Sequence, residues 1–206
     1  MHTTFRFLAW STCALSMLVS THTYAADPTG QFAVRGGGRI TCEQFVKARD
    51  DKNANVLAMV AGWLDGYLTG TNQHMSGNYA VAPWASTQLL GLLLYHNCKQ
   101  HPTANFFVAA NSMVQQMQGE RMTEVSPIVV AENEGKTVQV YQEVLRRLQV
   151  ALTEKGLYKG PPSGEYSADV IAAIKEYQRT INQPESGIPD QRVLWELLRP
   201  KIAAKK

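Results

Sequence analysis

The fold of the C-terminal half follows from residues 144–160, which read VLRRLQVALTEKGLYKG. Apolar residues recur in this stretch every three or four positions, the spacing that puts them on one face of a helix. The Gly-containing run at 156–160 then ends the pattern. We predict three helices, at about Val138–Lys155, Ala168–Ile181 and Pro189–Leu198. Their apolar stripes supply one shared core: Leu145, Leu148, Leu152, Val170, Ile174, Tyr177, Ile181, Leu194 and Leu198.

Several short motifs of this half occur in a fixed order. Leu148-Gln149 is followed by the GLYKG turn at 156–160, then by Gly164, by Tyr177-Gln178 and by the SGIPD turn at 186–190. Together they span about 60 residues and resemble the small three-helix peptidoglycan-binding domain. The chain departs from that family at one position: Ser163 precedes Gly164, where the family usually has Asp. The resemblance implies that residues 138–200 form a three-helix domain whose partner is peptidoglycan.

Five residues of this half are candidates for shaping or contacting a ligand site. Gln149 and Gln178 interrupt the apolar stripes, and two interpretations are open: their amides bond the backbone of the Gly-rich turns, or they contact ligand directly. Tyr158, Lys159 and Tyr166 flank the first turn. Aromatic rings there can stack on sugar rings or on a peptide stem, although exposed turn tyrosines are also common. We name Tyr158, Lys159, Tyr166 and Gln178 as candidate ligand-binding residues.

Residues 1–25 have the composition of a secretory signal peptide. They contain one basic residue, Arg6, no acidic residue, and an apolar stretch of 13 residues from Phe7 to Val19. A bilayer needs about 20 apolar residues, so the stretch is too short to span one, whereas a secretory core needs roughly 7 to 15. We expect cleavage after Ala25, with a membrane anchor as the alternative. The cleaved chain is then expected in the periplasm with no membrane span.

Cleavage at this point removes Cys13 and leaves Cys42 and Cys98 as an isolated pair. Two cysteines in an oxidising compartment are expected to form a disulfide. The bond closes a loop of 57 residues, counted inclusively. Loop-closure entropy sets its contribution at about 4 kcal/mol as an upper bound.

Residues 41–118 have the periodicity of four helices, between a flexible leader at 26–40 and an acidic connector at 119–137. The first helix begins at Thr41, which has capping-box spacing with Gln44. The third helix is apolar nearly all round, as buried helices are. The second, third and fourth helices are expected at about 53–71, 84–98 and 103–118.

Three motifs mark this four-helix region: TCEQF at 41–45, AGWLDGY at 61–67 and CKQHP at 98–102. They resemble the HdeA/HdeB family of small periplasmic acid-stress proteins. Members of that family are disulfide-bonded helical proteins, and the best-known are chaperones that expose apolar surface in acid. The resemblance implies a chaperone or adaptor role for residues 41–118. Four acidic and four basic residues balance between positions 42 and 118, and full protonation with three histidines brings this segment to +7.

We find no catalytic constellation in the sequence. His96, Cys98 and His101 have metal-ligand spacing, but Cys98 is expected in the disulfide. The GKT run at 135–137 lacks the first glycine of a phosphate loop, because Val130 stands in its place. Paired carboxylates, a His-rich zinc site and a catalytic triad are not indicated either. We therefore predict no catalytic residue, no metal site and no cofactor, and a non-enzyme.

With 206 residues, of which 45% are hydrophobic and 18% charged, the chain can bury the cores of two small domains. The net charge of +3 without a basic stripe gives no indication of nucleic-acid binding. We predict an all-α fold, in which a disulfide-linked four-helix domain precedes a three-helix domain and a basic tail at 201–206. The expected function is peptidoglycan binding combined with a chaperone or adaptor domain, and the expected protein partners are unfolded or other periplasmic proteins. Two alternatives remain: a wall-hydrolase accessory or cryptic wall enzyme, and an inhibitor or immunity-type binder of a wall enzyme.

Overall fold

A computed structural model describes residue 27 and residues 29–200. Within this part of the chain there are seven α-helices, two 3-10 helices and one two-stranded sheet. The predicted all-α class is confirmed, with one hairpin added to it. The signal peptide expected at 1–25 and the tail expected at 201–206 lie outside the described residues. No helix in the described part is long and apolar enough to cross a bilayer.

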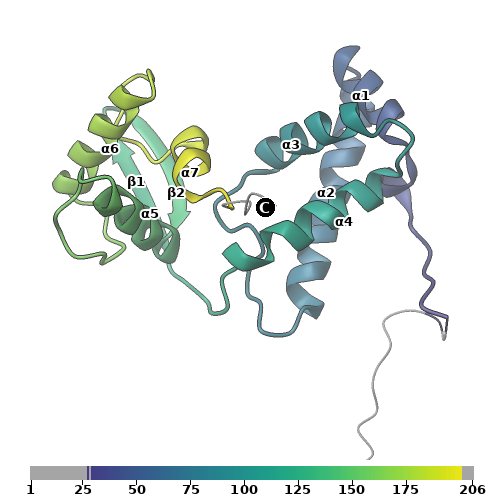
Figure 1. Cartoon of the computed structure of the whole chain (residues 1–206), viewed down its shortest axis with the longest axis horizontal. Helices are drawn as coiled ribbons and strands as arrows, with labels where there is room; N and C mark the ends of the chain where they lie inside the picture. Colours follow the sequence, from purple (N-terminus) through teal and green to yellow (C-terminus); the bar gives the residue numbers. More distant parts are fainter. Residues whose placement is uncertain (1–26, 28, 201–206) are drawn as a thin grey trace, which may run out of the picture. The chain divides into compact units, whose positions relative to one another are not determined.

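Figure 1 shows α1 to α4 grouped together, and α5 to α7 grouped with the hairpin. From Val34 onward the described chain forms one compact unit. Before it, the carboxylate of Asp27 accepts hydrogen bonds from the backbone N–H groups of Thr29 and Gln31, at 2.9 and 2.8 Å. The elements are η1 (Gly36–Arg39), α1 (Cys42–Asp50), α2 (Ala54–His74), α3 (Thr87–Gln100), α4 (Phe106–Met117), η2 (Gln118–Glu120), β1 (Ile128–Asn133), β2 (Lys136–Tyr141), α5 (Gln142–Glu154), α6 (Ala168–Thr180) and α7 (Gln191–Leu198).

Side-chain caps set the beginnings of the first four helices. The hydroxyl of Thr41 accepts a hydrogen bond from the backbone N–H of Gln44, whose side chain accepts one from the N–H of Thr41, which confirms the predicted capping box. Asn53, Ser86 and Asn105 cap α2, α3 and α4 through their side-chain oxygens. Each cap satisfies a backbone N–H that the helix itself leaves without an acceptor.

The Cys42–Cys98 disulfide joins the first residue of α1 to the last turn of α3, and its pairing is as predicted. Both cysteines are fully buried. Phe45 and Phe106 pack beside them, with ring centroids 4.8 Å apart. The prediction that α3 is buried on all sides is wrong in one respect, because Leu92 on this helix keeps 38% of its surface exposed. The helix buries one face: Leu90, Leu94 and Cys98.

The glycine run at 36–38 belongs to the packed structure. It forms η1, in which Gly37 and Gly38 are buried against α2. A Cβ atom on Gly38 would lie 2.3 Å from Cζ2 of Trp63. Such contact is sterically forbidden, so a residue without a side chain is needed here. The flexible leader predicted for 26–40 is therefore wrong from Gly36 onward.

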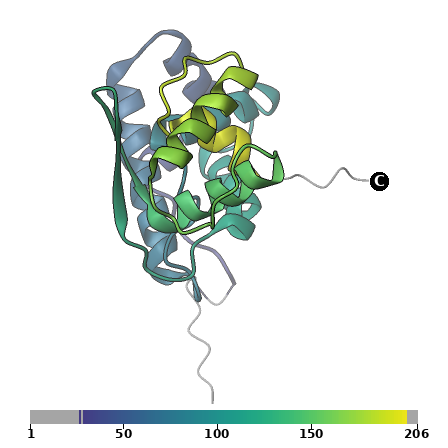
Figure 2. The ribbon, with the colours of Figure 1, turned by 90° about the vertical axis from the view of Figure 1, so that its left-hand side faces the viewer.

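The segment between α4 and α5 contains a β-hairpin. Its strands pair antiparallel from Ile128–Tyr141 to Asn133–Lys136, and alternate residues such as Ala131 and Val140 face inward and are buried. Figure 2 shows the hairpin running along the side of the three C-terminal helices. The helix predicted from Val138 therefore begins only at Gln142. The run of β-branched residues favours the strand, because such side chains pack well on a pleated surface.

Helices α5, α6 and α7 share one core, as their apolar stripes predicted. Leu145, Leu148 and Ile174 are among its fully buried members. The core also includes Trp84 and Met122, which precede the hairpin in sequence. Trp84 packs against Trp195 of α7, with ring centroids 6.0 Å apart. The core of the C-terminal helices thus extends beyond the range of 138–200 that the sequence indicated.

Candidate functional site

Two glycine turns of the same design shape the surface of the C-terminal helices. Gly164 precedes α6 and Gly187 precedes α7, and each follows a serine. Both have positive φ angles, +77° and +69°. A Cβ atom on Gly164 would meet the backbone oxygen of Gln142 at 2.6 Å, and one on Gly187 would meet Ile171 at 2.7 Å. Glycine is required at both turns for backbone conformation and for space.

A buried glutamine braces each turn. The side-chain oxygen of Gln149 accepts a hydrogen bond from the N–H of Gly164 at 2.7 Å, and its NH₂ group donates to the carbonyl of Glu165 at 3.0 Å. The side-chain oxygen of Gln178 accepts from the N–H of Gly187 at 2.8 Å. Of the two interpretations that the sequence left open, the structure shows the one in which the two amides bond the turn backbone. Gln178 is fully buried, and its NH₂ group donates to the hydroxyl of Ser186 at 2.9 Å. Its direct contact with a ligand is not shown and stays a prediction.

Tyr166 connects the two turns. Its hydroxyl donates a hydrogen bond to the carbonyl of Gly187 at 2.8 Å. Burial raises the pKa of this hydroxyl to about 12, so the group remains a neutral donor across the physiological range. The side chain is half-buried, with part of its surface left for contact with a ligand.

The remaining two predicted residues differ sharply in exposure. Tyr158 is buried, and its hydroxyl donates to the carbonyl of Pro161 at 3.2 Å. A Cβ atom on Gly160 would overlap the Tyr158 ring, so the second glycine of the GLYKG motif makes room for that ring. Lys159 is exposed and, with Asp169 of α6, lines an open depression of about 400 Å³. The role of both residues in ligand binding stays a prediction.

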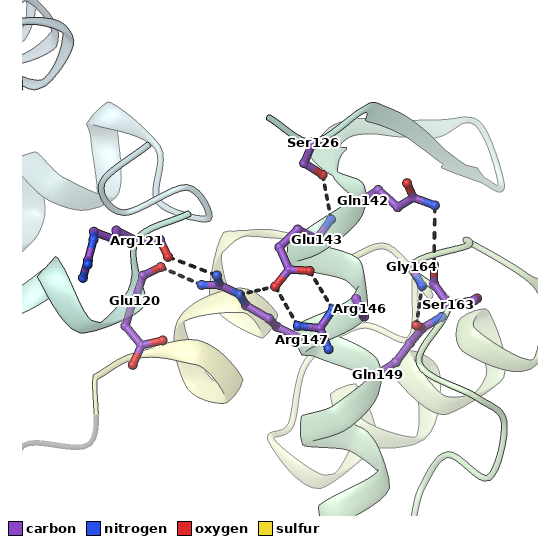
Figure 3. A network of polar contacts seen from close by, with 10 residues as sticks. All are labelled: Glu120, Arg121, Ser126, Gln142, Glu143, Arg146, Arg147, Gln149, Ser163 and Gly164. Carbon is purple, nitrogen blue, oxygen red and sulfur yellow. Dashed lines mark hydrogen bonds and ion pairs between the residues drawn. The ribbon is translucent and has the colours of Figure 1, made fainter. Parts of the chain in front are cut away.

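A polar network at the start of α5, which our sequence analysis did not single out, lies next to the first turn (Figure 3). Arg146 donates to both carboxylate oxygens of Glu143, from Nε at 2.6 Å and from Nη2 at 2.8 Å. Arg147 donates to the same carboxylate at 2.9 Å and to the carbonyls of Glu120 and Arg121, at 2.6 and 3.1 Å. The sequence signal was present, since residues three and four apart face each other on a helix.

The network has a strong effect on one carboxyl group. Hydrogen bonds from Arg146, and after them those from Arg147, lower the pKa of Glu143 to about 2 against an ordinary 4.5, although burial acts in the opposite direction. Glu143 is therefore ionised at any pH above about 3. The hydroxyl of Ser126 accepts a hydrogen bond from the backbone N–H of Glu143 at 2.9 Å. A side chain outside α5 therefore satisfies one of the first backbone N–H groups of that helix.

Aromatic side chains fill the N-terminal half. Trp63 and Tyr67, one helical turn apart on α2, stack with centroids 5.3 Å apart and planes 4° from parallel. Tyr67 donates its hydroxyl to the side-chain oxygen of Asn111 at 2.8 Å, and Phe107 packs edge-on against both rings. Among residues 27 and 29–200, no three His, Cys, Asp or Glu side chains come together as metal ligands would.

Comparisons with known protein families assign the two halves separately. Residues 7–108 match the model of the HdeA/HdeB family. Residues 141–197 match the model of the peptidoglycan binding domain. No curated protein and no solved structure matched the chain. Both resemblances seen in the sequence are thereby confirmed, and the chain carries an HdeA/HdeB-family domain followed by a peptidoglycan-binding domain.

Proposed function

We propose that this protein is exported to the periplasm, holds peptidoglycan through residues 138–200 and presents residues 41–118 as a chaperone or adaptor domain. The observation that carries the proposal is the presence of both matched domains in one chain. Neither domain type is an enzyme, which favours a binding role. A leader at residues 1–25 would supply the route out of the cytoplasm.

Wall binding is supported by the rigidity of the two glycine turns. Gln149 and Gln178 fix the turn backbones from inside, and Tyr166 ties one turn to the other. A surface held in this way loses little conformational freedom when it binds. Eight acidic and eight basic residues balance between Glu143 and Arg199. Binding should then depend on shape and hydrogen bonds, and only weakly on salt.

The chaperone role is supported by charge and by the disulfide. In acid the segment from position 42 to 118 rises from zero to +7, and this self-repulsion would loosen a small helical domain. Loosening would uncover α3 and the apolar face around Trp63 and Tyr67, on which unfolded proteins could settle. The Cys42–Cys98 bond would keep the expanded state compact enough to refold.

Two measurements on the full chain test the proposal. The protein should co-sediment with purified sacculi at low and at moderate salt, and it should suppress light scattering by an acid-denatured client at pH 2 to 3. Failure to sediment would refute the wall-binding role. Sedimentation without suppressed scattering would favour an inhibitor or adaptor, and clearing of sacculi on a zymogram would favour a cryptic wall enzyme.

A further inference from the structure

A polar groove lies beside the first two turns of α5. It has a volume of about 490 Å³ and is lined by residues 122–127, by four side chains of α5 and by Ser163. Ser163 directly precedes the braced glycine of the first turn, so the groove adjoins the surface that we propose for wall binding. Figure 3 labels several of its lining residues, with Arg146 and Arg147 on the Glu143 carboxylate and Ser163 beside Gln142.

Arg146 offers this groove an unused pair of donors. A guanidinium has five N–H groups arranged in fork-shaped pairs. Glu143 occupies the side fork of Arg146, formed by Nε and Nη2. The end fork, formed by Nη1 and the second hydrogen of Nη2, bonds no group among the described residues. The Arg146 side chain is 46% exposed, so a ligand can reach this fork.

The surrounding contacts hold the fork in place. Glu143 is fixed by two arginines, and Arg147 is itself anchored to the backbone carbonyls of Glu120 and Arg121. The three ionised side chains of α5 that line the groove, Glu143, Arg146 and Arg147, carry a net charge of +1. Glu124 is the other charged residue of the lining and is exposed, so the lining as a whole is neutral and the attraction for an anion is local to Arg146. A planar anion with two oxygens, such as a carboxylate, fits the end fork of an arginine that is held in this way.

The rest of the lining suits a peptide. Ser126, Ser163 and Thr123 contribute hydroxyl groups, and the amide of Gln142 reaches toward Ser163, donating to its carbonyl at 3.4 Å. Such groups can donate to and accept from the amides of a short peptide. Peptidoglycan supplies that chemistry in its peptide stems, each of which can end in a free carboxylate.

We propose that this groove binds the terminal carboxylate of a peptidoglycan stem peptide, with both carboxylate oxygens on the end fork of Arg146. The inference rests on the proposed wall-binding function and adds to it the part of the polymer that is bound. A carboxylate at the end of an ordinary protein chain has the same chemistry, so the experiment compares the two sources.

The test titrates the full chain with a soluble muropeptide whose terminal carboxylate is free, and with the same muropeptide after amidation of that group. Amidation should weaken binding by the unchanged protein about tenfold or more, the scale of hydrogen bonds to a charged group. Arg146→Gln should weaken binding of the free carboxylate to the same extent and should be indifferent to amidation. Arg179→Gln is the matched control, because Arg179 is also exposed and paired with carboxylates but lies outside the groove.

The outcomes distinguish a failure of the groove assignment from a failure of the wall-binding function. Equal binding by Arg146→Gln and the unchanged protein, with normal sedimentation on sacculi, would overturn the groove assignment and leave wall binding standing. A chain that does not sediment with sacculi would overturn both. An ordinary peptide with a free carboxylate that binds as tightly as the muropeptide would assign the groove to protein C-termini instead. Unchanged melting temperatures of both variants would show that folding is intact.

Discussion

Replacing Gln149 with Leu tests whether a buried amide builds the first glycine turn. The substitution keeps most of the side-chain volume but removes both hydrogen bonds to the turn. The N–H of Gly164 would then be buried without an acceptor, at a cost of about 1 to 3 kcal/mol. The carbonyl of Glu165 is at an exposed residue and can turn to water, so losing its bond costs about 1 kcal/mol.

The apolar leucine recovers part of this loss, because it buries more carbon than the amide does. We expect a net destabilisation of about 2 to 3 kcal/mol, which for a chain of this size lowers the melting temperature by roughly 5 to 10 °C. Thermal and urea unfolding of the full chain should be followed by far-ultraviolet circular dichroism. Gln142→Leu is the matched control on the same helix, since Gln142 makes one long bond of 3.4 Å to the turn.

The control should change the unfolding free energy by less than about 0.5 kcal/mol. If Gln149→Leu is as stable as the control, the amide does not hold the turn, and the rigidity argued for the wall-binding surface loses its basis. Gln149→Glu adds a further comparison. A carboxylate can accept from Gly164 but cannot donate to Glu165, so we expect it to restore little at neutral pH, where a buried charge is costly.

Three further predictions follow from other parts of the structure. Gly38→Ala should destabilise the protein by about 1 to 3 kcal/mol, because the new methyl group would overlap Trp63. The control Gly62→Ala, on an open face of α2, should be neutral or stabilising, and thermal melting measures both. Cys42→Ser should cost about 2 to 5 kcal/mol in denaturant unfolding, while the unreduced native protein should show no titratable thiol from the bonded pair. The folded-state pKa of Glu143, about 2, lies below the ordinary 4.5, so its stabilising contribution is complete above about pH 4.5 and is lost as the pH falls through 2. Glu143→Gln should accordingly lower the free energy of unfolding by about 1 to 2 kcal/mol at pH 7, after allowance for solvent contact, and by almost nothing at pH 2. An equal loss at both pH values would contradict this assignment.

Local patterns in the sequence determined much of this protein. The helices follow from apolar periodicity and from caps such as Thr41, since both depend on neighbours within one turn. The Cys42–Cys98 pair followed from counting the cysteines that remain after the expected cleavage at Ala25. The placement of Gln149 and Gln178 within apolar stripes showed that their amides need partners and left two open, the turn backbone or a ligand. The structure provides the turn backbone.

Contacts between distant residues were decided only by the tertiary structure. Nothing near Gly38 in sequence shows that the Trp63 ring will lie against it, and nothing near Trp84 shows that it will join the core of α5 to α7. The hairpin at 128–141 was missed because its strands are short, and a short apolar run such as 138–141 cannot be told from the start of a helix by periodicity alone. The groove beside Arg146 depends on residues 122–127 and Ser163 meeting one helix, and side chains 15 or more positions apart are brought together by packing alone.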